Sequence, residues 1–531
     1  MELHGKQIIG RGVSAKGNAS SQAQNPVTGE LLAGAFHHAT AEELKTAVTL
    51  AEQAWRELEA TSVEQRADFL DRIGAEIMRL GDALLERCNL ETALPPGRLE
   101  AERARTCNQL GMFAKLVREG TWVDARIETP QPDRKPLPKP DLRLLRRSLG
   151  PVVVFCASNF PLAFSVAGGD TASALAGGNP VLVKAHHAHP GSAELVGRAI
   201  QQAADTCGMP EGVFSLLHGP GREIGSALVR HPSIKAVGFT GSRTGGRALY
   251  DLAVSRPSPI PVYAEMSSIN PVFVLSGAAR ERGQQIASGL SQSVTLGVGQ
   301  FCTCPGVVVV EAGRDSESFL RIAARLLAES ARGTMLSAGI YSAYLGGVRQ
   351  LQNRSGVRLL EQQDAMAESS RNRAVPALFR TEATTFLADE LLREEVFGPI
   401  TVAVVCASKQ ELHKVAAVFQ GELTATIHGN ETDLDGCQEL IAMLEERVGR
   451  LVYGGFPTGV EVCSAMHHGG PYPATTDVHF TSVGTAAIYR FSRPVCYQNA
   501  PDRLLPDELK DANPRGIWRL VDDELTKKSI G

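Results

Sequence analysis

The sequence predicts an α/β protein whose main sheet is mostly parallel and is covered by helices on both faces. Two observations predict this fold. From residue 151 onward, short β-branched runs alternate with helical segments, and a second series of the same kind follows from residue 271. Alternation at this density is typical of parallel strands joined by helical crossovers. The 531 residues leave room for two to four domains with large cores.

The chain before the first series is expected to be mostly helical. Thr40 and Glu43 form a capping box, in which the two side chains satisfy free backbone N–H groups at a helix start. The same pattern recurs at Thr61 and Glu64. Apolar residues repeat at helical spacing after both boxes, so we predict that a helix follows each of them.

A different composition marks residues 128–150. Five prolines lie between positions 130 and 140 and exclude a helix, and the basic stretch that follows can form an exposed ribbon. Near the other end of the chain, residues 484–501 return to strand character before the sequence turns polar. We predict that these two segments pair, either within one chain or across a subunit boundary.

The first strand–helix series contains candidate positions for a ligand. Helical segments separate five predicted strands, at 151–157, 180–185, 212–219, 234–240 and 261–266. Ligands of parallel sheets bind beyond the carboxyl ends of the strands. The residues at or after these strand ends are therefore binding candidates: Ser158, Asn159, Lys184, Gly219 to Arg222, Gly241, Ser242 and Glu265.

The second series predicts another α/β unit with its own sheet. Its expected strands and helices alternate along the chain, at 271–276, 283–296, 306–312, 316–331, 400–407 and 408–419. The segment GVGQFCTCPG joins the first of these helices to the next strand, and it places Cys302 and Cys304 one residue apart.

This cysteine pair has several interpretations. An isolated C-x-C lacks the further ligands of a metal site, and residues two apart rarely reach disulfide geometry. A cysteine at a turn can be reactive, since backbone amides or a nearby cation lower its pKa, but free cysteines are most often buried and structural. The spacing alone leaves a nucleophile and a buried structural cysteine as alternatives for Cys302.

Composition and charge exclude several classes of function. The net charge of −4 gives no bulk attraction to nucleic acid or acidic membranes, and no apolar run approaches the ~20 residues of a membrane span. The 10 cysteines are scattered without a C-x-x-C pair, so no metal site is expected. The first residues lack the apolar core of a signal peptide. We therefore expect a reduced, cytoplasmic protein that binds neither nucleic acid nor membranes.

Two polar residues near strand ends supply further chemistry. Glu265 ends a predicted strand, where a solvated loop carboxylate is the common case. Asn159 lies between a strand and a helix, where asparagine often serves as a turn residue or helix cap. Together with Cys302 they supply a base, an amide donor and a nucleophile, which are the components of acyl transfer.

Six motifs resemble those of a known family. They follow the order and approximate spacing of the aldehyde dehydrogenase superfamily over nearly the whole chain: NPVTGE at 25–30, SNFPL at 158–162, FTGSRTGG at 239–246, AEMSSINP at 264–271, GQFCTCPG at 299–306 and EEVFGP at 394–399. Three segments are also similar to 2-oxoglutarate semialdehyde (2,5-dioxopentanoate) dehydrogenases, a branch related to NADP-dependent fatty-aldehyde dehydrogenases: GGDTASALAGGNPVLVKAHHAHPG, EMSSINPVF and HHGGPYPATTD.

The resemblance implies an aldehyde dehydrogenase fold with a Rossmann-like cofactor domain, an α/β catalytic domain and a small β element for oligomerisation. The expected boundaries, in that order, are 1–127 with 151–262, 263–480, and 128–150 with 481–500, followed by a C-terminal tail over 501–531. Family members form dimers and tetramers through the ribbon and the tail strand. We accordingly expect a homodimer or homotetramer.

The resemblance also implies a mechanism. Cys302 would attack the aldehyde carbonyl, and the Asn159 side chain with the Cys302 backbone N–H would hold the oxyanion. Hydride transfer to the nicotinamide would leave a thioester, which water activated by Glu265 would hydrolyse to the carboxylate. Cys304 is expected to pack as a neighbour, with a mixed redox species under oxidation as the alternative.

Cofactor positions follow from the same match: Lys184 at the adenosine ribose, Gly241 and Ser242 at the pyrophosphate, and Glu395 with Phe397 at the nicotinamide ribose. NAD-preferring relatives often carry a glutamate where this chain has His187, which can donate a hydrogen bond instead of repelling a 2′-phosphate. Arg222 would pair with that phosphate, with a solvated arginine at a helix start as the alternative. The expected cofactor is NADP, without excluding NAD.

The favoured substrate is 2-oxoglutarate semialdehyde, an aldehyde that also carries a carboxylate. The alternatives are a fatty or other aldehyde, or a catalytically silent scaffold on the same fold. The match to fatty-aldehyde relatives places His468 near the thiol, unless His467 and His468 merely pack in the tunnel wall. A desolvated carboxylate needs a cation, and Arg103 and Arg105 are the candidates.

Overall fold

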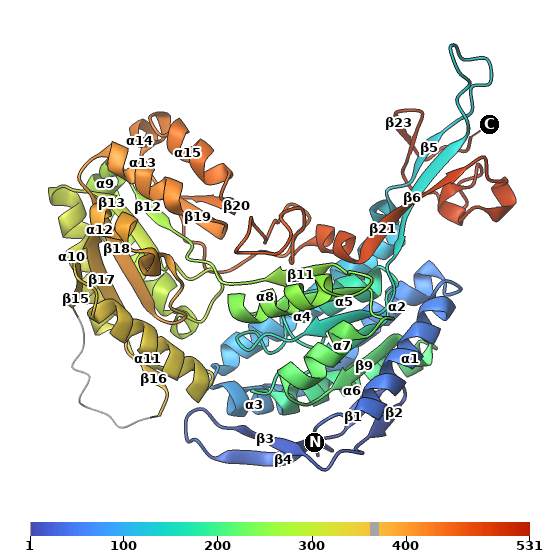
Figure 1. The fold of residues 1–531 in the computed structure, drawn as a ribbon, viewed down its shortest axis with the longest axis horizontal. Coiled ribbons are helices and arrows are strands. Elements are labelled where there is room, and N and C mark those ends of the chain that lie inside the picture. Colours follow the sequence, from blue (N-terminus) through green and yellow to red (C-terminus); the bar gives the residue numbers. More distant parts are fainter. Residues whose placement is uncertain (1, 362–370, 531) are drawn as a thin grey trace.

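Two α/β lobes and a projecting ribbon make up the protein (Figure 1). The computed structural model describes residues 2–361 and 371–530. One lobe contains the N-terminal half of the chain, coloured blue to green, and the other contains residues 272–453, coloured from yellow-green to orange. Each lobe has its own seven-stranded sheet, as the two strand–helix series predict.

The sheet of the first lobe has the order β11-β10-β7-β8-β9-β1-β2. Its strands are β1 Gln7–Ile9, β2 Gly12–Ser14, β7 Val152–Phe155, β8 Val181–Lys184, β9 Phe214–Leu217, β10 Ala236–Thr240 and β11 Val262–Glu265. The strands β7 to β11 are mutually parallel, whereas β1 and β2 pair antiparallel at one edge. All five predicted strands are therefore confirmed, and their carboxyl ends meet at one edge of the sheet.

Helices cover both faces of this sheet. They are α1 Ala41–Leu58, α2 Val63–Arg79, α3 Gly81–Thr92, α4 Pro96–Glu119, α5 Gly169–Ala176, α6 Pro190–Thr206, α7 Ser226–Arg230 and α8 Arg243–Val254. Successive residues of β7 point to opposite faces, so Val152 and Val154 join the core under α2 to α6. Val153 between them joins a second core under α1, α7 and α8.

The predicted N-cap residue is confirmed for α1 and is wrong for α2. Thr40 caps α1 as predicted: its hydroxyl accepts from Glu43 N at 3.2 Å, and its own N–H donates to Glu43 Oε2 at 2.8 Å. The prediction for α2 is wrong by one residue, because Ser62 caps it and accepts from Gln65 N at 3.0 Å. Thr61 instead donates its hydroxyl to the last turn of α1.

The second lobe repeats the architecture with the strand order β15-β17-β18-β13-β12-β19-β20. Its strands are β12 Val272–Val274, β13 Val307–Glu311, β15 Val357–Glu361, β17 Ala377–Glu382, β18 Ile400–Cys406, β19 Glu422–His428 and β20 Val448–Tyr453. The helices are α9 Ser276–Thr295, α10 Arg314–Glu329, α11 Ala338–Gln352, α12 Ala383–Ala388, α13 Lys409–Val418, α14 Glu431–Asp435 and α15 Gln438–Glu445. Only β15 is antiparallel. The sequence predicted three of these strands.

The ribbon is a five-stranded sheet with the order β21-β6-β5-β22-β23. Its strands are β5 Arg126–Glu128, β6 Leu142–Ser148, β21 Ser492–Gln498, β22 Arg519–Val521 and β23 Glu524–Thr526. The predicted pairing of the two segments occurs within the chain, where β21 runs antiparallel to β6. Two details differ from the prediction: residues 485–491 form a 3-10 helix, and the polar C-terminal tail adds β22 and β23 to the sheet.

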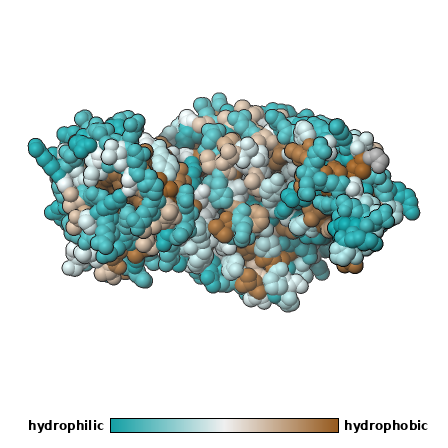
Figure 2. Space-filling view, turned by 90° about the horizontal axis from the view of Figure 1, so that it is seen from above, coloured by the Kyte–Doolittle hydropathy of each residue, from teal (hydrophilic) through white to brown (hydrophobic). Residues whose placement is uncertain are grey.

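The face from which the ribbon projects carries hydrophilic residues with separate apolar patches among them (Figure 2). Two short antiparallel strand pairs complete the fold: β3 Ser20–Gln24 with β4 Leu31–His37, and β14 Gly333–Thr334 with β16 Arg373–Ala374. Within the described residues, no helix has both the length and the apolar character that crossing a membrane requires.

Candidate active site

A cavity of about 480 Å³ is lined by residues of both lobes. Seven of the predicted site residues line it: Asn159, Gly241, Ser242, Glu265, Cys302, Glu395 and Phe397. The strand ends of the first lobe and two loops of the second lobe therefore meet at one place. The volume lies in the ~300–1,000 Å³ range of small-molecule sites.

Backbone pairing brings three segments that are far apart in the sequence to this cavity. Glu265 is the last residue of β11, and Cys302 lies in the turn after the 3-10 helix Leu296–Gly299. His468 belongs to the long loop after β20. That loop runs beside the end of β11, where Met266 N donates to Ala474 O at 2.7 Å.

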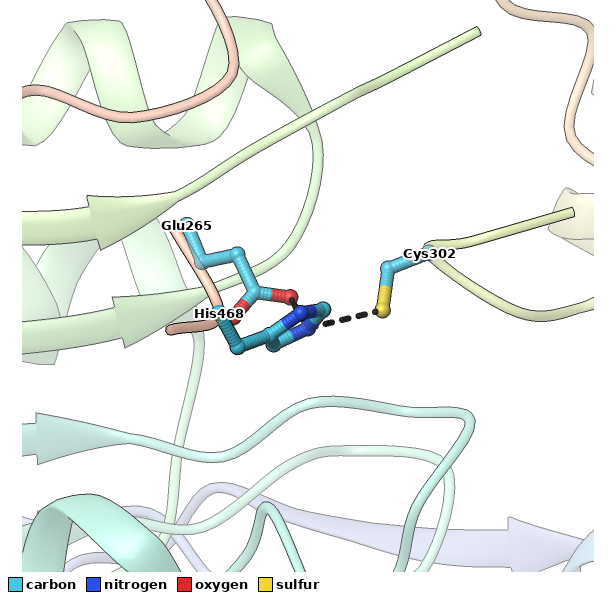
Figure 3. A group of neighbouring side chains, drawn as sticks. All are labelled: Glu265, Cys302 and His468. Atoms are coloured by element: carbon cyan, nitrogen blue, oxygen red, sulfur yellow. Dashed lines mark hydrogen bonds and ion pairs between the residues drawn. The ribbon is translucent and has the colours of Figure 1, made fainter. Parts of the chain in front are cut away.

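The imidazole of His468 lies between the other two side chains (Figure 3). Its Nε2 is 3.4 Å from Cys302 Sγ and 3.0 Å from Glu265 Oε1. The imidazole and the carboxylate are almost fully buried, at 1% and 3% exposure, and the Ser482 hydroxyl donates to Glu265 Oε2. One imidazole nitrogen therefore faces both the thiol and the carboxylate. The neighbouring His467 is only half-buried.

Burial and charge set the protonation of the pair. Burial acts to raise the pKa of Glu265, but the His468 imidazole and the Ser482 hydroxyl outweigh it, so this pKa lies below its usual range. Burial raises the pKa of the Cys302 thiol well above its usual range, and the Glu265 carboxylate raises it further. The site at rest therefore holds a neutral thiol beside an ionised carboxylate.

Two N–H donors belong to residues that line the same cavity as the thiol. The Asn159 Nδ2 donates to the Gln300 carbonyl at 3.0 Å, which uses one of its two amide hydrogens. Arg98 fixes the same residue by donating from Nη2 to the Asn159 carbonyl at 2.9 Å. The Cys302 backbone N–H has no hydrogen-bond partner among the described residues. Both donors are thus available to an oxygen bound near Cys302 Sγ.

A buried network that the sequence analysis missed ties the Glu265 strand to the Cys302 turn. Asn270 has a φ of +53° and donates from Nδ2 to the carbonyls of Cys302, at 2.8 Å, and Cys304, at 3.1 Å. The Ser268 hydroxyl accepts from Leu423 N and donates to Glu422 Oε2 at 2.8 Å. Burial raises the pKa of Glu422 to about 7. The only sequence signal was the position of Asn270 in the motif AEMSSINP, because β19 was not predicted.

Cys304 lies away from this contact. It is 8% exposed and packs with Phe160, Ala163 and Phe301. Its sulfur is 3.8 Å from the Gly398 carbonyl, and burial raises the pKa of its thiol. Cys304 therefore occupies a packed position behind the turn and is a neighbour of Cys302, whose thiol lines the cavity.

The predicted cofactor residues divide into two groups. Gly241, Ser242, Glu395 and Phe397 line the cavity; Gly241 N donates to the Glu265 carbonyl at 3.0 Å, and Ser242 caps α8. Burial raises the pKa of Glu395 to about 8. The second group does not line the cavity: Lys184 is the last residue of β8, His187 follows that strand, and Arg222 follows β9.

The second group has different surroundings. Lys184 is buried, donates to the Ala185 carbonyl at 2.7 Å, and has a pKa lowered by burial. His187 is exposed, with its ring 4.4 Å from that of His186. Arg222 is exposed in a π-helical turn, and its side chain has no partner among the described residues.

The thiol, imidazole and carboxylate also have the spacing of metal ligands. Their nearest ligand atoms lie within 4.8 Å of one another, and no other cluster of this kind occurs among the described residues. The same three groups are a nucleophile, an imidazole beside it and a base, which are also the components of thiol chemistry. The absence of a metal stays a prediction.

Sequence comparison decides the family. Residues 13–451 match the Aldehyde dehydrogenase family. The chain belongs to this family. It is 51% identical to alpha-ketoglutaric semialdehyde dehydrogenase 2 of Azospirillum brasilense, over 98% of this chain and 99% of that protein. It is 43% identical to alpha-ketoglutaric semialdehyde dehydrogenase of Acinetobacter baylyi, over 99% of both.

Solved structures confirm the predicted fold of this aldehyde dehydrogenase. Lactaldehyde dehydrogenase from Escherichia coli superimposes with a TM-score of 0.80 at 21% identity, covering 94% of this chain and 99% of that one. An NADP-dependent glyceraldehyde-3-phosphate dehydrogenase from Bacillus halodurans, complexed with NADP, gives 0.79 at 20% identity, covering 94% and 100%. The chain is thus an NAD(P)-dependent oxidoreductase with an aldehyde substrate. A catalytically silent scaffold is not supported.

Proposed function

We propose that this aldehyde dehydrogenase oxidises 2-oxoglutarate semialdehyde to 2-oxoglutarate and prefers NADP as its cofactor. The observation that carries the chemistry is the placement of His468 Nε2 between Cys302 Sγ and Glu265 Oε1, in a cavity with room for a cofactor. The choice of substrate is supported by near-full-length similarity to two alpha-ketoglutaric semialdehyde dehydrogenases, which are named for this same aldehyde.

His468 activates the thiol in this proposal. The raised pKa of Cys302 means that the sulfur must lose its proton to solvent before it attacks. The Nε2–H of His468 donates to the Glu265 carboxylate at 3.0 Å, and the same edge of the ring lies 3.4 Å from the sulfur. His468 therefore acts by stabilising the thiolate that forms.

Asn159 and the Cys302 backbone N–H hold the oxyanion that forms when the sulfur adds to the carbonyl. Donors placed in advance at such an oxygen are typically worth about 3 kcal/mol each in the transition state. Arg98 and Gln300 keep Asn159 in place through hydrogen bonds of 2.9 and 3.0 Å. The nicotinamide, when bound, supplies the acceptor for the hydride.

Glu265 serves as the base for the second half of the reaction. Its lowered pKa keeps it ionised at neutral pH, so it can take a proton from the water that attacks the thioester. Its two oxygens are held by His468 and Ser482, which fixes the carboxylate beside the imidazole that contacts the sulfur. Hydrolysis then releases the carboxylate product and restores the thiol.

The residues present fit an NADP cofactor. Gly241 and Ser242 lie at the N-terminus of α8, where backbone N–H groups favour a pyrophosphate. Glu395 and Phe397 line the cavity and would hold the nicotinamide ribose. Lys184 ends β8 and His187 follows it, and these two residues would lie at the adenosine ribose. The unpaired, exposed guanidinium of Arg222 suits a 2′-phosphate.

Assembly and location complete the proposal. We assign the oligomerisation element to 128–150 and 481–500, although Ser482 also contacts Glu265, so the start of the second segment contributes to the site. The long edge strand β21 is suited to pair with a second copy, which supports a homodimer or homotetramer. We place this assembly in the cytoplasm. Light scattering of the purified protein tests this: a monomer at micromolar concentration contradicts it.

The substrate assignment is tested by product analysis. Purified enzyme is incubated with 2-oxoglutarate semialdehyde and NADP, and NADPH and 2-oxoglutarate are both quantified. We expect the two products in equal amounts, with lower kcat/KM when NAD replaces NADP. Absence of 2-oxoglutarate overturns the substrate assignment. A clear preference for NAD overturns the cofactor assignment.

A further inference from the structure

Arg105 on α4 is a cation without a partner near the active site. Its side chain makes no hydrogen bond and no ion pair with any residue of the described chain, and its Nε is buried. The residue as a whole is half-buried, and burial lowers its pKa. A guanidinium has five N–H donors, and a partly desolvated one is costly unless an acceptor binds to it.

The position of Arg105 connects it to the thiol. Its Cζ lies 5.5 Å from the centre of the Phe164 ring and 5.9 Å from that of Phe160. The Phe164 ring is in turn 6.5 Å from the His468 ring, whose Nε2 contacts Cys302. The charge of Arg105 also acts against burial on the pKa of the Cys302 thiol, so the two groups lie within electrostatic reach.

The other arginines of this region already donate hydrogen bonds to backbone carbonyls. Arg98 donates to the Asn159 carbonyl, and Arg450 donates from Nη2 to the Pro457 carbonyl at 2.7 Å. Arg103, the second candidate from the sequence, donates from Nη1 to the Gly81 carbonyl at 2.8 Å, at the start of α3. Arg105 alone of the four has its donors unused among the described residues.

Nearby acids do not take these donors. Glu102 exerts the strongest attraction on Arg105, but its Oε1 accepts from Leu162 N at 2.8 Å and Ala163 N at 3.0 Å, and it forms no ion pair with Arg105. Glu461 acts more weakly, and its side chain is exposed. The guanidinium therefore faces an apolar, aromatic surface with an acceptor missing.

We propose that Arg105 binds the distal carboxylate of the substrate and thereby selects a short acidic aldehyde over a neutral one. The planar guanidinium can keep one face on the Phe160 and Phe164 rings while its edge donates two parallel hydrogen bonds to a carboxylate. The aldehyde end would then reach Cys302. This inference rests on the proposed function and gives its substrate class a structural cause.

Substitution of Arg105 tests the assignment. Arg105→Met keeps the packing on the rings and removes the charge, and Arg105→Lys keeps the charge without the planar fork. Arg103→Met is the matched control, since it removes the same charge two positions away on the same helix. We expect Arg105→Met to lower kcat/KM for 2-oxoglutarate semialdehyde about 10- to 150-fold, chiefly through KM, because a charge-assisted contact is lost. Arg105→Lys should lie between. Pentanal oxidation should fall much less than oxidation of the acidic aldehyde, because only the weaker effect of the charge on the thiol is lost.

A second measurement separates this inference from the proposed function. Glutarate is tested as a competitive inhibitor of pentanal oxidation, which needs no acidic substrate. We expect inhibition of wild type and of Arg103→Met, and its loss in Arg105→Met. Equal loss of activity on both aldehydes, or glutarate inhibition that survives Arg105→Met, overturns the subsite. If glutarate inhibition depends on Arg105 but wild type shows no preference for the acidic aldehyde, the carboxylate subsite is confirmed and the proposed substrate is wrong.

Discussion

The cavity and the aromatic wall, two regions beside Cys302, are built by different means. The cavity is formed by strand ends and turns of both lobes, and its polar groups include glycine backbone, Ser242 and Glu395. The wall consists of Phe160, Phe164 and Phe301, against which the side chains of Arg98 and Arg105 stack from α4. We assign the first to the part of the cofactor that meets Cys302, and the second to the choice between aldehydes.

The two regions would determine different kinds of specificity, one for the cofactor and one for the aldehyde. A parallel sheet presents its carboxyl ends to a ligand whatever the substrate is, so the cavity follows from topology. The wall depends on which side chains one helix presents, and a few substitutions there can change the substrate without altering the fold. Variants at the thiol, the base, the imidazole and the proposed cofactor residue Arg222 therefore test the role of each group separately.

The thiol, which both regions share, should have the largest effect. Cys302→Ala should abolish aldehyde oxidation, because no other group can form the thioester, while NADP binding measured by calorimetry stays near that of wild type. Cys304→Ala is the matched control and should keep most activity, since its buried sulfur contacts carbonyls rather than the site. A dead Cys304→Ala with an active Cys302→Ala would reverse the roles.

The base between the two regions comes next. Glu265→Gln should spare the first hydride transfer and stall hydrolysis of the thioester, because water is a poor nucleophile without a base. Rapid mixing should then show up to one NADPH per active subunit, followed by turnover roughly 10²- to 10⁴-fold slower. Loss of the burst with normal cofactor binding would move Glu265 to an earlier step, such as activation of the thiol.

The imidazole should govern the pH dependence. Because the pKa of Cys302 is raised, the thiolate fraction grows with pH, and the wild-type rate should be lowest on the acid side and rise with pH. His468→Ala removes the N–H edge that stabilises the thiolate, so we expect a lower kcat at neutral pH and a rise that begins at higher pH. His468→Gln serves as the control for packing. A pH–rate profile that superimposes on wild type contradicts this role.

A smaller effect is expected at the far edge of the cofactor region. Arg222→Ala should weaken NADP about 10- to 150-fold and leave NAD almost unchanged, because only NADP carries the 2′-phosphate. Arg230→Ala at the end of α7 is a matched control that removes an exposed arginine from the next turn of chain. Equal weakening of NADP and NAD by Arg222→Ala would favour the solvated arginine.

Local patterns predicted the first lobe well. The five strands β7 to β11 have short β-branched runs, and the residues at their ends lie at one edge because parallel strands require it. The second lobe was harder, since β17 and β19 contain polar residues such as Arg380 and Thr424 that obscure a buried strand. The second capping box moved to Ser62 because two adjacent hydroxyl residues both match the pattern.

The site itself depended on long-range pairing that local patterns do not contain. Only the family resemblance placed His468 near Cys302, and nothing in the spacing revealed that one nitrogen contacts both sulfur and carboxylate. Likewise the sequence offered Arg103 and Arg105 equally. The rotation along α4 turns Arg103 toward Gly81 and Arg105 toward the wall. The buried Glu422 had no sequence signal at all.

One steady-state comparison tests the proposed substrate most directly. With wild-type enzyme and saturating NADP, kcat/KM is measured for 2-oxoglutarate semialdehyde, pentanal and dodecanal. We expect the highest value for the acidic aldehyde, roughly 10- to 150-fold above the neutral aldehyde of similar length, as one charge-assisted contact allows. A preference for dodecanal, or equal values for the acidic and neutral short aldehydes, would contradict it.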